Sequence, residues 1–96
     1  MVIGKMMELA NKRMLGFDLE MLADTYRDMW VDYFHTKENR TLNSCVQMYI
    51  VGLAMDKYDN HRGEDMRAGA AMFASEMGHS PDEFQKEIEK ELTKGK

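Results

Sequence analysis

Residues 45–55, with the sequence CVQMYIVGLAM, are apolar on nearly every side of any helix they could form. A helix at the surface of a soluble domain would carry a broad polar stripe, and here Gln47 is the one strongly polar side chain. The segment is also far shorter than the roughly 18 to 20 apolar residues that cross a bilayer. It therefore predicts a buried central helix, within about residues 41–58, that the rest of the chain must cover.

Further helices are predicted around this segment, because no stretch alternates apolar and polar residues for long enough to form a strand. The clearest begins after Asp18 and ends near Lys37, with apolar side chains at i, i+3, i+4 and i+7. The others cover about residues 3–15, 64–77 and 81–92. About five short helices with short connections predict an all-α fold, a compact bundle or an orthogonal array. We expect one domain over residues 1–96, with a tail that frays from about residue 93.

Several helix ends have recognisable signals. Asp18 is placed as an N-cap, and Ser80, Pro81 and Glu83 have the spacing of a capping box. Gly16 is expected to end the first helix. The polar stretch DKYDNHRGED, residues 56–65, predicts a turn in which Gly63 takes a positive φ.

The charge of the chain argues against several partners. Its formal net charge of -4 has the wrong sign for a simple phosphate binder, so nucleic acid is not the expected partner. The basic residues dominate residues 1–17 and the acidic ones residues 18–40. These two segments could pair within the chain or between subunits.

The first residues, MVIGKMMELANKRM, contain too many charged side chains for a secretory signal. Cys45 is the only cysteine, so an intrachain disulfide is impossible and a reducing compartment is expected. No apolar run is long enough to span a membrane. We expect a cytoplasmic protein without membrane attachment.

Residues 69–92 have the outline of a helix-turn-helix, with small residues before Gly78 and an apolar anchor at Phe84. A recognition helix presents its first turn to the bases and needs cations near the phosphates. Here that turn carries Asp82 and Glu83. We expect a structural corner, with a DNA-binding regulator as the alternative.

Metal sites and catalysis have weaker signals. Glu76 and His79 form one Glu-x-x-His, whereas a di-iron helical bundle needs two such pairs and two further glutamates. Asp32 and His35 are similarly isolated. No phosphate-binding glycine loop or serine nucleophile motif is present, and Cys45 is expected to be a buried, inert thiol. We expect no metal, no cofactor and no enzymatic activity, and we keep a helical metal- or ligand-binding protein as a third possibility.

Methionine is the unusual residue, with 11 in 96 positions. Thioethers fill irregular gaps in a small core, and they also form adaptable binding surfaces. Aromatic residues are enriched in the centres of interfaces. The sequence predicts a partner-binding surface that also pairs two copies into a homodimer, with Trp30 either in that interface or in the monomer core. The residues expected there are Tyr26, Met29, Trp30, Tyr33, Met7 and Met14.

Together these features predict a small, acidic, methionine-rich helical protein that works by binding another protein. A regulator or inhibitor of a larger protein machine is the form we expect, including the compact inhibitors that viruses encode. This expectation follows from small size and from the lack of any catalytic motif.

Overall fold

A computed structural model, which describes residues 1–94, contains five α-helices and one short 3-10 helix. No strand occurs within the described residues. The predicted all-α fold is therefore confirmed. The elements are α1 (Ile3–Arg13), α2 (Leu19–His35), η1 (Lys37–Asn39), α3 (Leu42–Met55), α4 (Asn60–Glu76) and α5 (Pro81–Thr93).

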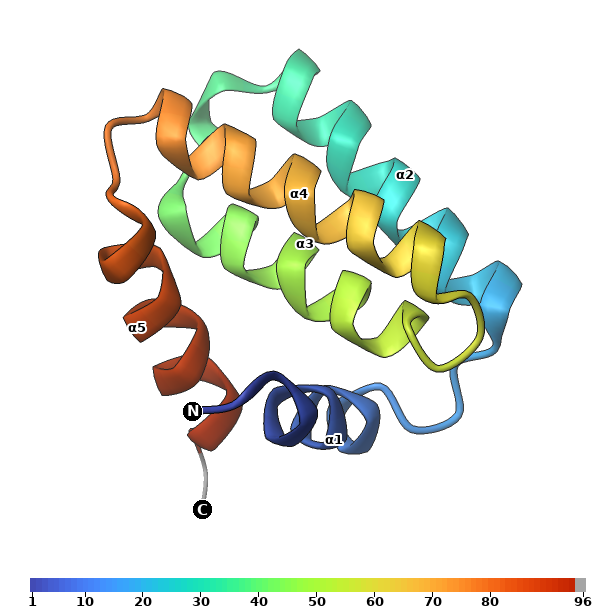
Figure 1. Cartoon of the computed structure of the whole chain (residues 1–96). Helices are drawn as coiled ribbons and strands as arrows, with labels where there is room; N and C mark the ends of the chain where they lie inside the picture. Colours follow the sequence, from blue (N-terminus) through green and yellow to red (C-terminus); the bar gives the residue numbers. More distant parts are fainter. Residues whose placement is uncertain (95–96) are drawn as a thin grey trace.

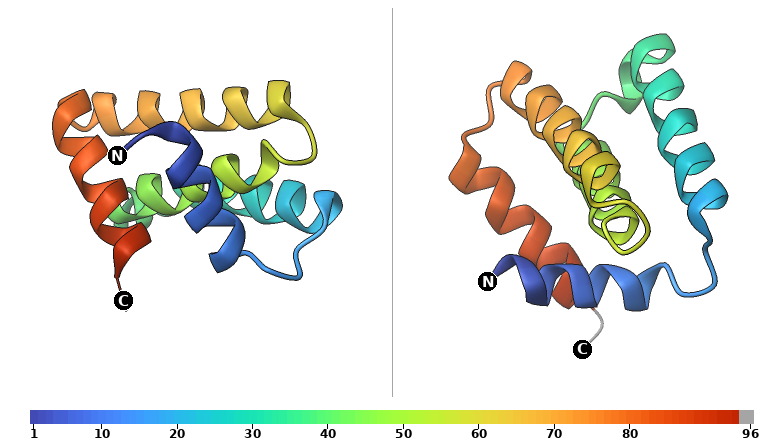
Figure 2. Two further views of the ribbon diagram at one scale, coloured as in Figure 1. Left: turned by 60° about the horizontal axis from the view of Figure 1, so that its bottom comes forward. Right: turned by 45° about the vertical axis from the view of Figure 1, so that its right-hand side comes forward.

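Helix α3 occupies the centre and packs against α1, α2, α4 and α5. α4 runs back along α3 in the opposite direction, and α2 runs alongside them in the same direction as α4 (Figure 1). α1 crosses below α3, and α5 closes the remaining side (Figure 2, right). The Cα radius of gyration is 12.4 Å, close to the value of about 12.5 Å for a compact domain of this length.

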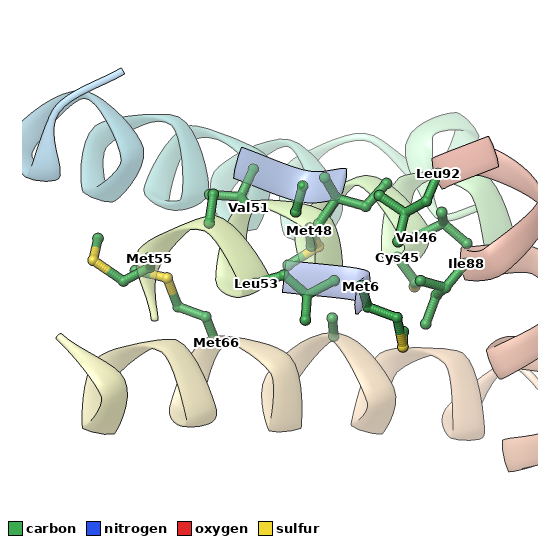
Figure 3. Packing of buried hydrophobic residues seen from close by; sticks show 14 of the residues in the cluster. Met6, Cys45, Val46, Met48, Val51, Leu53, Met55, Met66, Ile88 and Leu92 are labelled. Carbon is green, nitrogen blue, oxygen red and sulfur yellow. The ribbon is translucent and has the colours of Figure 1, made fainter. Parts of the chain in front are cut away.

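The core is built around the segment that the sequence placed at the centre. Nine residues of α3 are buried, from Cys45 to Met55, and only Gln47 and Tyr49 of that run remain partly exposed. Figure 3 shows several of these side chains, among them Cys45, Met48 and Met55, together with Met6 of α1, Met66 of α4, and Ile88 and Leu92 of α5. The prediction of a buried central helix is confirmed, because each side of α3 meets an apolar face of another helix.

α3 and α4 pack closely at two glycines that leave no room for a side chain. A Cβ atom on Gly52 of α3 would lie 2.9 Å from Cγ of Arg67, and a Cβ on Gly63 of α4 would collide with the side chain of Asp56, the C-cap of α3. Ala70 and Ala74 of α4 are also fully buried. Small side chains at the contact therefore let the two helices pack closely.

The start of α4 differs from the prediction. The helix begins at Asn60, four residues earlier than expected, because Asp59 is its N-cap and accepts a hydrogen bond from the Arg62 amide at 3.1 Å. Gly63 lies inside the helix and has no positive φ, so its expected role in a turn was wrong. Close contact with Asp56, rather than a turn, accounts for this glycine.

Other helix ends agree with the sequence in part. Asp18 accepts from the Met21 amide at 2.8 Å, and Ser80 accepts from the Glu83 amide at 3.1 Å, so both N-caps are confirmed. The Glu83 carboxylate instead meets Nδ1 of His79 at 2.8 Å. The reciprocal capping box is made by Thr41 and Ser44, ahead of α3. α5 ends at Thr93, and the last part of the predicted frayed tail, residues 95–96, lies outside the described residues.

Candidate protein-binding face

Tyr33 is the most buried of the residues that the sequence assigned to a partner surface. Its ring stacks on Phe73 of α4 with centroids 4.0 Å apart and planes inclined by 15°. Only 6% of its surface is exposed. Burial raises the pKa of the phenol, and the nearby Cys45 and Glu76 act in the same direction. Tyr33 therefore belongs to the core of the monomer and is not offered to a partner.

Trp30 is half-buried in the seam between α2 and α4. Its ring packs edge-on against Phe73 at a centroid distance of 4.6 Å. It also covers Gly69, where an added Cβ would lie 3.2 Å from Cζ2 of the indole. Its Nε1 is buried and has no hydrogen-bond partner within the described residues. The inner edge of Trp30 thus packs within the monomer, and only its outer edge reaches the surface.

Tyr26 lies one turn earlier on α2 and ties the same seam together. Its hydroxyl donates a hydrogen bond to the Met66 carbonyl of α4 at 2.8 Å. Burial raises the pKa of this phenol as well. A Cβ on Gly69 would approach the Tyr26 oxygen to 2.7 Å, so the glycine makes room for both aromatic side chains.

Phe34 extends the aromatic seam to the surface and was missing from the residues expected at the interface. Its ring lies 5.4 Å from Trp30 and 5.5 Å from Phe73, yet 52% of the residue is exposed. The i, i+4 spacing from Trp30 is the sequence signal that could have found it. Met72 of α4, 46% exposed, adds a second apolar side chain on the outer side of that helix.

Two side chains of opposite charge flank this seam on α4. Arg62 lines a shallow hollow of about 280 Å³ with Tyr26 and Trp30. Glu76 lies at the other end of the helix, near Tyr33. Neither makes an ion pair among residues 1–94. We call this surface the α2–α4 face, and its residues are Tyr26, Trp30, Phe34, Arg62, Gly69, Met72 and Glu76.

The expected methionines do not join this face. Met29 is half-buried and lines a separate hollow of about 380 Å³ between α2, η1 and the start of α3. Met7 and Met14 come from the α1 segment and pack against the core there. The structure therefore brings Tyr26 and Trp30 together and leaves the three methionines elsewhere.

The basic residues of α1 are engaged within the chain. Lys5 and Lys12 lie 3.6 and 3.7 Å from Glu8, and Arg13 reaches Glu91 of α5 at 2.9 Å. Their partners are thus in α1 and α5, and the acidic residues of α2 are not among them. The charge contrast between the first two segments accordingly says nothing about pairing of subunits.

The histidine of one pair that suggested a metal site has a different partner. Nδ1 of His79 lies 2.8 Å from a carboxylate oxygen of Glu83, not of Glu76. Within residues 1–94, no three His, Cys, Asp or Glu side chains are grouped so as to hold a metal ion.

Cys45 is fully buried, and burial raises the pKa of its thiol to about 11. A thiol in that state is a poor nucleophile, since the reactive species is the thiolate. Of the helices in the described residues, none combines the length and the apolar character needed to cross a bilayer.

The helix-turn-helix outline corresponds to the corner between α4 and α5. Gly78 takes a φ of +90°, and α5 leaves this turn at a steep angle to α4 (Figure 1). Asp82 and Glu83 occupy the first turn of α5. Carboxylates at that position would enter the groove of a bound duplex, where the nearby phosphates would repel them.

Comparisons of the chain with models of protein families, with curated proteins and with solved structures find no match in any of the three.

Proposed function

We propose that this chain is a non-enzymatic protein–protein interaction module and that the α2–α4 face is its binding surface. The observation that carries the proposal is Phe34, which is half-exposed although it contacts both Trp30 and Phe73. Half the surface of this aromatic side chain is in water. A partner that buries its apolar area gains roughly 25 cal/mol of free energy for each Å² buried.

The rigidity of the seam supports this choice of surface. Trp30 and Phe34 rest on Phe73, and Tyr26 is held by its hydrogen bond to α4. Aromatic side chains that are already fixed lose little conformational freedom on binding. A larger part of the free energy gained by burying them therefore contributes to the affinity. Trp and Tyr are also the residues in which interface hot spots are most often found.

A regulator or inhibitor of a larger protein machine, with a homodimer as the working form, is the concrete function that we propose for such a face. We further propose that the protein is cytoplasmic and that it binds another protein rather than a nucleic acid. In size it resembles the compact inhibitors that viruses encode. The small size and the absence of a recognised catalytic motif support it.

Photocrosslinking in the cells that produce the protein tests the proposal. A benzophenone amino acid at position 34 is expected to give covalent adducts with another polypeptide, because that side chain points into the proposed contact. Tyr58 provides a matched control, since it is also an exposed aromatic residue, at 42%, but follows α3 at the far end of the molecule. Equal yields at the two positions, or no adduct at position 34, would contradict the proposed face.

A further inference from the structure

We propose that the partner of the α2–α4 face is a basic amphipathic segment of another polypeptide. An arginine or lysine side chain of this segment enters the hollow between α2, η1 and the start of α3, which we call the η1 hollow. Its apolar side chains cover Phe34 and the neighbouring Val31. This inference rests on the proposed function and adds the chemistry of the partner.

The charge of the η1 hollow is the first observation that supports a basic partner. The hollow measures about 380 Å³ and lies where the chain turns from α2 through η1 into α3 (Figure 1). Its charged lining residues are Asp32 of α2 and Glu38 of η1. Neither carboxylate makes an ion pair among residues 1–94, and Lys37, the residue before Glu38, does not line the hollow. The negative charge of the hollow is therefore left for a cation from outside the chain.

The uncharged lining of the η1 hollow suits a long cationic side chain. Met29, which is half-buried, contributes apolar surface from α2. The wall that follows α2 is polar and consists of Asn39, Thr41, Asn43, Ser44 and Gln47. Arginine and lysine lay their apolar stems along apolar surface and keep the charged head among polar groups. Both parts of such a side chain thus find matching surface in the hollow.

The η1 hollow is continuous with the exposed aromatic end of the α2–α4 face. Tyr33 lines the hollow, and its ring centroid is 5.7 Å from that of Phe34. On the outer side of α2, Val31 lies about 100° from Asp32 in one direction and about 60° from Phe34 in the other. Val31 is 50% exposed, so the outer surface of α2 between the hollow and Phe34 is apolar. A partner segment that crosses α2 over Val31 can reach both.

Further carboxylates surround this end of the face. Asp28 lies one turn before Asp32 on α2 and is exposed. Glu76 of α4 is exposed as well and is close enough to Tyr33 to raise the pKa of its phenol. Arg62 lies near the opposite end of the face, beside Tyr26. The exposed aromatic end is thus bordered by acidic side chains on both sides, which favours a cationic partner and repels an anionic one.

The chain's own arginines near α2 are engaged elsewhere. Arg27 lies 2.6 Å from Asp24. Arg40 donates hydrogen bonds to the carbonyls of Tyr33 and Phe34 at 2.6 and 2.8 Å. Neither guanidinium lines the η1 hollow. The basic group that fits the hollow therefore has to come from a partner.

A pair of matched peptides tests the inference. The first is an amphipathic helical peptide of alanine, leucine and arginine, and the second replaces each arginine by citrulline, which has nearly the same shape without the charge. Calorimetry measures the affinities, and amide NMR shifts locate the contact. The arginine peptide is expected to bind about tenfold more tightly and to shift Met29, Val31 and Asn43, because only its charged groups are attracted by the carboxylates.

Variants of the protein assign this preference to the η1 hollow. D32N/E38Q is expected to weaken the arginine peptide about tenfold and to leave the citrulline peptide unchanged, since the charge pairing is lost from one side only. E64Q/D82N is the matched control, because it removes the same two charges from exposed positions on α4 and α5 that do not line the hollow. It should leave the preference for arginine intact. Circular dichroism checks that each variant is folded.

The apolar contact is tested in the same assay. Phe34→Ala is expected to weaken both peptides by the same factor, because each carries the leucines that cover this ring. Leu15→Ala is the control, since Leu15 is also an exposed apolar residue, in the turn between α1 and α2. It should weaken neither peptide.

Failure of the arginine peptide to bind, equal affinities of the two peptides, or equal effects of D32N/E38Q and E64Q/D82N would overturn the inference. A wild-type dimer that Phe34→Ala converts to monomers on sedimentation would do so too, since a second copy would then occupy the face. The proposed function is judged separately, by the crosslinks from position 34. Adducts whose yield is the same in D32N/E38Q would uphold the face and reject the basic partner, whereas no adducts at all would reject the face itself.

Discussion

Asp56 and Arg67 form a partly buried ion pair across the turn between α3 and α4, with Nη2 of Arg67 3.0 Å from Oδ2 of Asp56. The Asp56 side chain is 3% exposed and that of Arg67 16%. Nη2 of Arg67 donates to both carboxylate oxygens of Asp56, whereas Nε has no hydrogen-bond partner within the described residues, so Asp56 supplies the main compensation for burying this cation. Gly63 leaves the space that the carboxylate fills.

Asp56→Ala is expected to lower the free energy of unfolding by about 2 to 4 kcal/mol, because it leaves the partly buried guanidinium of Arg67 without its counter-charge. Urea unfolding followed by circular dichroism measures the change. Asp24→Ala is the control, since its pair with Arg27 is exposed and should contribute less than about 1 kcal/mol. Equal effects of the two substitutions would show that the Asp56–Arg67 pair contributes no more to the free energy of unfolding than an exposed pair.

Gly63→Ala is expected to destabilise the protein by about 1 to 3 kcal/mol, the usual loss when a packed core is overfilled. The added methyl group would collide with the Asp56 carboxylate and backbone. Gly4→Ala is the matched change, because Gly4 is also helical but has nothing within 4 Å of the new Cβ. It should stabilise the protein by less than about 1 kcal/mol, since Gly4 lies in the first turn of α1. The two alanine substitutions are thus expected to shift the urea midpoint in opposite directions.

Ser80→Ala is expected to lower the free energy of unfolding by about 0.5 to 2 kcal/mol through the loss of the α5 N-cap. Ser75→Ala, on the exposed surface of α4, removes a hydroxyl without removing a cap and should change stability little. Thermal unfolding of both variants compares them. An unchanged midpoint for Ser80→Ala would show that this cap contributes nothing measurable to the stability of the protein.

The stability of the protein is expected to fall as the pH rises from about 9 to 11. Burial raises the pKa of Cys45 to about 11 in the folded state, so the unfolded chain loses this proton first. The stability that this shift contributes is complete below the pKa of the thiol in the unfolded chain. It is lost as the pH rises through the pKa of the thiol in the folded protein. Urea unfolding at a series of pH values should show a steeper loss for the wild type than for Cys45→Ala. Parallel curves would exclude this thiol as a source of the pH dependence.

Binding to duplex DNA at physiological salt is expected to be negligible, because the first turn of α5 presents Asp82 and Glu83. Fluorescence anisotropy with a labelled duplex measures it. Sub-micromolar, salt-sensitive binding that is lost in Lys86→Ala and Lys90→Ala but kept in Lys12→Ala would instead support the DNA-binding alternative, since Lys12 lies on α1.

Local patterns in the sequence were sufficient to predict the helices and the central position of α3. Periodicity and caps act over a few residues, so Asp18 and Ser80 could be identified as N-caps without knowledge of the fold. The start of α4 was misplaced because a glycine usually weakens a helix. The close contact of Gly63 with Asp56, seven residues earlier, outweighed the low helix propensity of glycine.

The sequence by itself determined that this chain is helical and that its most apolar segment must be covered on all sides. Only the tertiary structure decided which aromatic side chains do the covering. Tyr33 and Phe34 are adjacent in sequence and equally apolar in pattern, yet Tyr33 stacks under Phe73 and Phe34 stays half in water. Neighbouring residues on a helix point about 100° apart, and the position of α4 determines which of the two directions leads into the core.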